Sequence, residues 1–234
     1  MYFSHINSYR KKANIMKMGT PAQNAARLVI YCLGLLVLAF GIALSVNCNL
    51  GVSPVRSLPY VVSQILGITL GTCTTIIYGL YVLLQMLIHG KKFQPALFIQ
   101  LVFSTVFGYF VDGAKAVLGD FMLPTYLGQL AMLAVSIVLI AFSLVLYIDV
   151  QIAPMPAEGL VACIADKLGK PFSTIKTLFD CTSVLVGATL CFLFLGRLTG
   201  IREGTVITAM LVGRMTGIIR KRLTPLLRKV CFGE

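Results

Sequence analysis

The chain has 234 residues, of which 58% are hydrophobic and only 12% are charged, and its mean hydropathy is +0.90. Soluble globular chains carry roughly 25% charged residues, so this chain has too few charges to cover the surface of a soluble domain. The composition excludes an ordinary soluble enzyme, a disordered chain and a coiled coil. It indicates an all-α, polytopic transmembrane helical bundle.

Six apolar segments predict transmembrane helices, and two shorter ones predict helices that do not cross the membrane. Each of the six has roughly 16 to 23 residues, enough for a bilayer core of about 30 Å. The short segments, 54–68 and 156–168, each begin at a proline after a polar stretch, which is typical of half-helices or re-entrant helices. The six predicted spans are 28–46, 72–89, 95–111, 127–148, 173–195 and 204–219.

The net charge of +12 is concentrated at the two ends of the chain. Basic tails beside membrane spans are typical of cytoplasmic termini and favour anionic lipid headgroups, so we expect contact with a lipid bilayer and none with nucleic acid. An eight-span alternative would move Lys91 and Lys92 outside and Lys115 inside, and the loop charges favour six spans slightly. The basic residues of the tails are Arg10, Lys11, Lys12, Lys17 and Arg27, then Arg220, Lys221, Arg222, Arg228 and Lys229.

The second half of the chain repeats the first. A shift of 102 residues aligns 39–84 with 141–186 without a gap. Each half then has about three spans and one short helix, so the halves have inverted topology, a pattern that points to a transporter site; the alternative is a duplication that only builds a stable bundle. Identical pairs include Pro54/Pro156, Leu66/Leu168 and Gly67/Gly169, and after a small gap Gly108 falls opposite Gly213. The predicted units are a tail (1–27), two repeats (28–118 and 126–219) and a second tail (220–234).

A polar break precedes each short segment. Pro54 and Pro156 suit the first helical turn, and Ser53 suits the N-cap. The free backbone N–H groups at such a helix start can receive an anion or a polar headgroup. We expect the breaks to line a cavity, and the alternative is that they are wet interfacial loops. The residues that break the helices are Gly51, Pro54, Pro154, Pro156 and Gly159.

Two pairs of charges lie in or near these segments. Arg56 and Glu158 occupy equivalent repeat positions, where they form either a structural pair or a gate. Lys176 and Asp180 share one helix face at i,i+4 spacing, either as a polar-substrate or proton-coupling group or as a packing pair. Tyr78 is the counterpart of Asp180 in the first half. The candidate substrate-binding residues are Asn49, Ser53, Arg56, Glu158, Lys176, Asp180 and Tyr78.

The break-and-pair pattern resembles the YczE/YyaS/YitT group of bacterial integral membrane proteins, most closely its YczE branch. This resemblance covers about residues 28–219 and implies a multi-pass protein of the bacterial inner membrane. Arg56 stands where that branch has an acid, and Ala157 stands where it has an arginine. With Arg56 in the first break and Glu158 in the second, the positive and negative charges have changed places between the two breaks. The matched residues are Gly51, Ser53 and Pro54, then Pro156 to Leu160, Lys176 with Asp180, and in part Arg202 to Thr205.

No motif of catalysis or of metal or cofactor binding appears in the chain. His5 and His89 have no ligand partner at helical spacing, and the seven cysteines show no C-x-x-C. We therefore expect no enzyme, no cofactor and no bound metal. Gly213 and Gly217 have the spacing of a close helix crossing. The favoured function is a transporter or permease for a small polar or anionic solute; the alternative is a non-transporting scaffold for a membrane-protein partner or a homo-oligomer.

Overall fold

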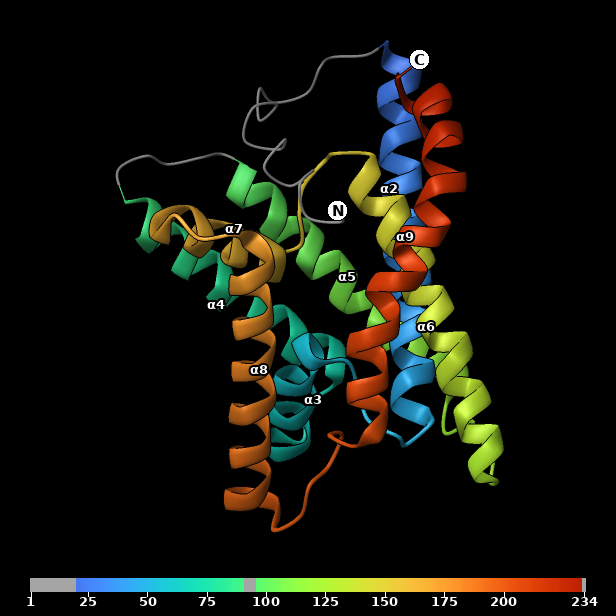
Figure 1. Ribbon diagram of the computed structural model, residues 1–234, viewed down its shortest axis with the longest axis vertical. Helices are drawn as coiled ribbons and strands as arrows, with labels where there is room; N and C mark the ends of the chain where they lie inside the picture. Colours follow the sequence, from blue (N-terminus) through green and yellow to red (C-terminus); the bar gives the residue numbers. More distant parts are fainter. Residues whose placement is uncertain (1–19, 91–95, 233–234) are drawn as a thin grey trace.

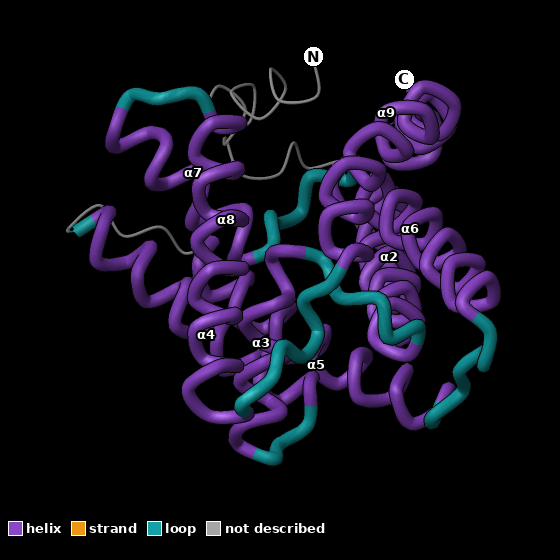
Figure 2. Tube along the Cα trace, turned by 60° about the horizontal axis from the view of Figure 1, so that its bottom comes forward, coloured by secondary structure: helices purple, strands orange, loops and turns teal. Residues whose placement is uncertain are grey.

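The computed structural model describes residues 20–90 and 96–232, and in that part every regular element is helical (Figures 1 and 2). His5, the basic residues Arg10 to Lys17, and Lys91 and Lys92 lie outside the described residues. A five-residue π-helical turn, Cys191–Leu195, extends the seventh of the described α-helices. The α-helices are α2 (Pro21–Asn47), α3 (Pro54–Leu66), α4 (Leu70–His89), α5 (Ala96–Leu118), α6 (Tyr126–Asp149), α7 (Pro156–Leu168), α8 (Phe172–Leu190) and α9 (Glu203–Phe232).

Five helices are long and apolar enough to span a membrane: α2, α4, α5, α6, and α8 with its π-helical turn. Each overlaps one of the predicted spans, with ends that differ by up to seven residues; residue 95, the predicted start of the third span, lies outside the described residues. The sixth predicted span, 204–219, forms the first part of α9, which is not among these five. α9 continues without a break to Phe232, so most of the predicted tail 220–234 is helical; 30 residues make it about 45 Å long.

The two short segments form the predicted short helices. α3 and α7 have 13 residues each and are therefore about 20 Å long, less than the roughly 30 Å of a bilayer core. Each begins with its proline and ends at a glycine in the left-handed conformation, Gly67 with φ 64° and Gly169 with φ 63°. A side chain at either position would be strained, so glycine suits both helix ends. α3 ends two residues before the predicted end of segment 54–68, and α7 has the bounds of the predicted segment 156–168.

The helices form two groups joined by α5. In both views α2, α6 and α9 lie together on one side, α3, α4, α7 and α8 lie on the other, and α5 crosses between them (Figures 1 and 2). α2 and α6 are antiparallel: Arg27, near the start of α2, donates to the carbonyl of Val150, just past the end of α6, over 2.9 Å from Nη2. α3 packs on α8, and α7 packs on α4.

The helix ends of the two halves coincide at the shift found in the sequence. A shift of 102 residues carries the last residue of α2 onto that of α6, both ends of α3 onto those of α7, and the start of α4 onto that of α8. Asn49 and Gln151, which this shift also superposes, both have left-handed backbone, with φ 56° and φ 55°. Corresponding residues therefore fold alike locally.

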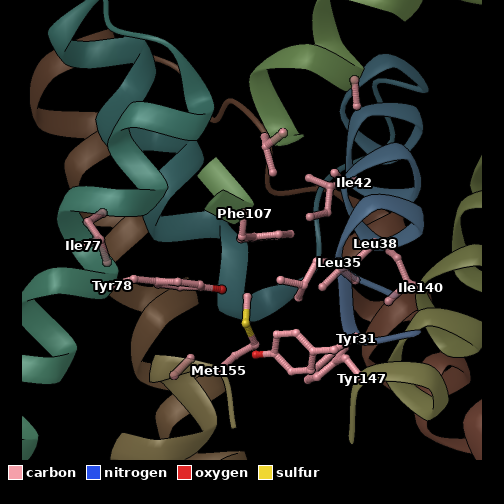
Figure 3. Packing of buried hydrophobic residues seen from close by; sticks show 14 of the residues in the cluster. Tyr31, Leu35, Leu38, Ile42, Ile77, Tyr78, Phe107, Ile140, Tyr147 and Met155 are labelled. Carbon is pink, nitrogen blue, oxygen red and sulfur yellow. The ribbon is translucent and has the colours of Figure 1, made fainter. Parts of the chain in front are cut away.

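The main hydrophobic core lies where the two groups meet. Tyr31 and Leu35 of α2, Tyr78 of α4, Phe107 of α5 and Met155 before α7 are buried in one cluster (Figure 3). The Tyr31 and Phe103 rings lie 4.5 Å apart, and Tyr78 stacks on Phe107. Aromatic pairs of this kind stabilise a core beyond their buried area. The core holds helices from both halves of the chain together.

Candidate functional site

Arg56 and Glu158 are the third residues of α3 and α7. Both side chains are half-buried. Two of their polar atoms, Arg56 Nε and Glu158 Oε2, are buried and have no hydrogen-bond partner among the described residues. No ion pair within 4.0 Å joins the two side chains, both of which the structure describes. Arg56 and Glu158 thus carry opposite charges at equivalent positions, as the sequence shows, but they do not form an ion pair.

The surroundings of Glu158 are electrostatically mixed. Its carboxylate lies within interaction range of Lys176, Arg56 and Asp180. α7 is not one of the five candidate spans. Burial raises the pKa of the Glu158 carboxyl, while Lys176, its own backbone N–H and Arg56 act in the opposite direction. The neighbouring cations thus favour the charged form of the Glu158 carboxyl, which burial and the nearby Asp180 disfavour.

Lys176 and Asp180 form the ion pair that their spacing predicts. Nζ of Lys176 lies 2.5 Å from Oδ1 of Asp180 on α8. Removal of either partner would leave the other charge poorly solvated, which inside a protein is far more costly than loss of a surface pair. The opposite charges of Lys176 and Asp180 compensate each other, and each of them also interacts electrostatically with Glu158.

Two tyrosines of the hydrophobic core lie beside the charged cluster formed by Arg56, Glu158, Lys176 and Asp180. Tyr78, a predicted site residue, is buried and lies within interaction range of Arg56 and Glu158, and in Figure 3 its hydroxyl points toward Met155. Tyr31, which the sequence did not single out, also interacts with Glu158. Its hydroxyl donates to the carbonyl of Ala153 over 3.2 Å, which ties α2 to the second break. These hydroxyls supply uncharged polar groups beside the two short helices.

The first break is held by the segment before α9. Gly51, with φ 109°, leaves no room for a side chain, because an added Cβ would lie 2.6 Å from Oγ1 of Thr205. The backbone N–H of Val52 donates to the carbonyl of Gly200 over 2.9 Å. Asn49 is exposed, and its carbonyl accepts from Nη1 of Arg202 over 3.0 Å. Asn49 thus makes its contact away from the Arg56–Glu158 cluster.

Ser53 occupies the predicted N-cap of α3, but its side chain makes no capping hydrogen bond. Its hydroxyl instead accepts from Nη1 of Arg56 over 3.4 Å. The N-cap of α7, Met155, has no side-chain cap either. Both short helices therefore present first-turn N–H groups that side chains at the N-cap do not satisfy, which adds positive potential near the cluster.

The second break is packed against α4 and α5. Pro156 begins α7, and Gly159 lets that helix approach closely, since an added Cβ would lie 2.6 Å from Oε1 of Gln85. Nε2 of Gln85 donates to the carbonyl of Pro156 and to Oε1 of Gln100, over 3.2 Å in each case. Pro154 is exposed. The sequence singled out Gly159 as a breaker, and the structure places it at a helix crossing.

Two polar contacts that the sequence did not predict occupy matching places in the halves. At the end of α2, Asn47 Oδ1 accepts from Nζ of Lys115 on α5 over 2.6 Å. At the end of α6, Asp149 Oδ1 accepts from Nη2 of Arg220 on α9 over 2.6 Å, and Thr224 also binds this carboxylate. The alignment that pairs Gly108 with Gly213 also pairs Lys115 with Arg220. Each half therefore ties its first helix to its last by one cation.

Five apolar helices and buried charges between two short helices define a multi-pass helical membrane protein. Among the described residues, no three His, Cys, Asp or Glu side chains gather as a metal site would require. The chain belongs to a family of unknown function, DUF6198, whose model matches residues 25–221.

Two curated relatives agree with this assignment. The chain is 27% identical to the "Uncharacterized membrane protein YczE" of Bacillus subtilis (strain 168) over 188 residues, which cover 80% of this chain and 82% of the relative. It is also 27% identical to the "Uncharacterized protein YyaS" of the same organism over 184 residues, 78% of this chain and 87% of that protein. No solved structure matches. The expected resemblance to the YczE group is thus confirmed.

Proposed function

We propose that this protein is a small-solute transporter or permease, not an enzyme, with its polar site between the two halves at Arg56 and Glu158. The observation that carries the proposal is that equivalent positions of two short helices hold opposite charges with buried, unpartnered atoms. Ionisable groups at membrane depth are costly and usually mark solute or ion pathways. A purely structural pair would be expected to close into an ion pair.

The organisation of the chain in two halves supports this proposal. The helix ends coincide at one shift, α2 and α6 run antiparallel, and a cation ties the first helix to the last in each half. Inverted repeats with short helices at corresponding positions are characteristic of transporters in which two halves move around a fixed site. Arg56 and Glu158 lie where such a site would be.

The charge distribution supports a cytoplasmic side for both termini. The start of α2, the end of α6, the start of α8 and the end of α9 all lie toward one end of the molecule (Figure 1). Lys167 lies in the last turn of α7, Lys170 lies between α7 and α8, and five basic residues lie in the last part of α9. By the positive-inside rule this end faces the cytoplasm, in agreement with an inner-membrane protein with contacts to anionic lipid.

Transport can be tested in liposomes that contain the purified full chain. The wild-type protein is expected to take up radiolabelled solute from a panel of small polar metabolites, and Arg56→Gln, Glu158→Gln and Asp180→Asn are each expected to reduce that flux at least about tenfold. Arg197→Gln and Glu203→Gln are matched controls, since both residues are exposed. If all three site variants retain wild-type flux, the proposed roles are wrong.

A second candidate is a non-transporting scaffold for a membrane-protein partner or a second copy of this chain, and the exposure of α8 favours it. Only 17% of the apolar stretch of α8 and its π-helical turn is buried, against 39 to 50% for the other four candidate spans. The scaffold predicts stable co-purification in mild detergent, lost on changes to this face but unaffected by Arg56→Gln. Exposed apolar residues on it include Leu178, Leu185, Phe192, Leu193 and Phe194.

A further inference from the structure

The four charges around the short helices sum to zero. Arg56 and Lys176 are cationic, and Glu158 and Asp180 are anionic when ionised. Lys176 and Asp180 already neutralise each other over 2.5 Å. Arg56 and Glu158 are then the two opposite charges of the cluster that are left without an ion-pair partner.

These two charges are held apart although attraction would draw them together. Arg56 belongs to α3 and Glu158 to α7; both helices pack on α4 and on α8, and the two short helices do not pack on each other to a comparable extent. The two side chains interact electrostatically, but no guanidinium nitrogen of Arg56 lies within 4.0 Å of a carboxylate oxygen of Glu158. Each keeps a buried polar atom without a partner, an arrangement that costs free energy unless something else satisfies it. The geometry thus offers one anionic and one cationic contact, separated by more than an ion-pair distance.

Resting on the transport function proposed above, we infer that the solute is a zwitterion whose anionic group binds Arg56 and whose cationic group binds Glu158. A simple anion would satisfy Arg56 and leave Glu158 buried without a partner, and a simple cation would do the reverse. A zwitterion satisfies both and keeps the net charge of the site at zero, which matters most where water is scarce. The uncapped start of α3 beside Arg56 adds to the attraction for the anionic group.

The charge class can be tested by matched probes on the purified full chain in detergent. Linear ω-amino acids of two to six carbons are compared with the carboxylic acids and the primary amines of the same lengths, for example γ-aminobutyrate, butyrate and butylamine. Unfolding is followed with a thiol-reactive dye, because Cys48, Cys73 and Cys191 are buried in the folded protein. We expect at least one ω-amino acid to raise the melting temperature, and the matched acid and amine to have no effect.

Two variants sharpen this test by reversing the preference. Arg56→Gln removes the cation of the cluster that has no ion-pair partner and leaves the four groups with a net negative charge, so the variant is expected to lose the response to the ω-amino acid and to gain one to the amine. Glu158→Gln is expected to gain a response to the acid instead. In each variant the apparent affinity for the ω-amino acid should fall at least about tenfold, the effect expected from the loss of one charge-assisted hydrogen bond. Arg197→Gln and Glu203→Gln are expected to behave like the wild type, which separates a local effect from a change in overall charge.

The outcomes separate this inference from the proposed function. Stabilisation of the wild type by the acids or the amines alone, or by none of the three series, would overturn the zwitterion and leave transport to be judged by the liposome flux. Stabilisation by ω-amino acids that Arg56→Gln and Glu158→Gln do not alter would place binding elsewhere and also overturn it. Zwitterion-specific stabilisation without flux would support the binding site and count against transport.

Discussion

The crossing of α4 with α5 in the first half differs from its counterpart, α8 with α9, in the second. α4 and α5 pack closely at Gly71 and Gly108, where an added Cβ on Gly71 would lie 2.0 Å from the Gly108 carbonyl oxygen. Asp112 fastens this crossing: Oδ1 accepts from the Gly71 N–H over 2.7 Å, and Oδ2 accepts from Oγ1 of Thr69 over 2.6 Å. The first half therefore has a locked helix pair.

The second half lacks three of the four residues that form this lock. Pro171, which has no side-chain hydroxyl, stands at the position of Thr69. Ser173 stands at the position of Gly71, and Gly217 stands at the position of Asp112. Gly213, the counterpart of Gly108, has no neighbouring atom within 4 Å of an added Cβ, and α8 and α9 lie apart. Since α8 carries Lys176 and Asp180, the helix with the site's ion pair is also the helix with fewer constraints. The difference shows that the α8–α9 crossing is less tightly packed than the α4–α5 crossing.

The largest expected effect comes from breaking the locked crossing. Gly108→Val should prevent stable folding or lower the free energy of unfolding by about 1–3 kcal/mol or more, because its Cβ would meet Oγ1 of Thr75 at 2.1 Å. The matched change Gly213→Val should lower the melting temperature far less, since its side chain enters open space. Thermal unfolding in detergent measures both. Equal losses in the two variants would contradict the difference between the crossings.

The next effect concerns the polar ties at the ends of α2 and α6. Asp149 is buried and holds Arg220 and Thr224, so Asp149→Ala should cost about 1.5–3 kcal/mol. Asn47→Ala removes a neutral partner of Lys115 and should cost about 0.5–1.5 kcal/mol. Denaturant or thermal unfolding measures the loss in the free energy of unfolding of each variant. A larger loss for Asn47→Ala would show that the tie in the first half is the stronger one.

A smaller effect is expected from building the lock into the second half. Ser173→Gly with Gly217→Asp restores two of the three missing residues, so α8 should move toward α9. A gain of about 1 kcal/mol in the free energy of unfolding would raise the melting temperature by a few degrees. If movement of α8 is needed for transport, the same variant should lose flux in liposomes. The reverse change Asp112→Gly is the control, and it should lower stability. A double variant with higher stability and unchanged flux would argue against a moving α8.

The sequence predicted features whose signals are local. Pro54 and Pro156 mark the starts of α3 and α7, and the i,i+4 spacing of charged residues predicted the ion pair on α8. Each signal depends on a few neighbouring residues, so no knowledge of packing was needed. The repeat then extended these signals from one half to the other, and it placed the charges of α3 and α7 at equivalent positions.

What the sequence missed depends on how distant helices pack. No sequence feature near Asp112 predicts its hydrogen bond with Gly71, which lies 41 residues away. The contacts of Asn47 and Asp149 likewise depend on residues of another helix. The G-x-x-x-G spacing of Gly213 and Gly217 predicted a close crossing, yet neither has a neighbour within 4 Å of an added Cβ. Spacing on one helix shows that close approach is sterically allowed; the partner surface decides whether it occurs.

The smallest expected effect separates the two halves by pH. The site charge of the first half is the guanidinium of Arg56 and that of the second half is the carboxyl of Glu158, whose pKa burial raises above its ordinary 4.5. As pH falls through this pKa the carboxylate is protonated and the cationic end of a zwitterion loses its partner. Stabilisation by an ω-amino acid should therefore be complete at higher pH and weaken as the pH falls.

An ω-aminosulfonate is the best probe for this titration, because its sulfonate stays ionised throughout. The charged or titratable groups that face Glu158 are Arg56 on α3, Lys176 and Asp180 on α8, Tyr31 on α2 and Tyr78 on α4. Glu158→Gln should abolish the pH dependence, while Glu203→Gln should leave it intact. A pH profile that survives in Glu158→Gln would assign the titration to another member of this set, with Asp180→Asn as the next variant to measure. A flat profile in the wild type would mean that Glu158 keeps one protonation state across the range, and the second half would then be as insensitive to pH as the first.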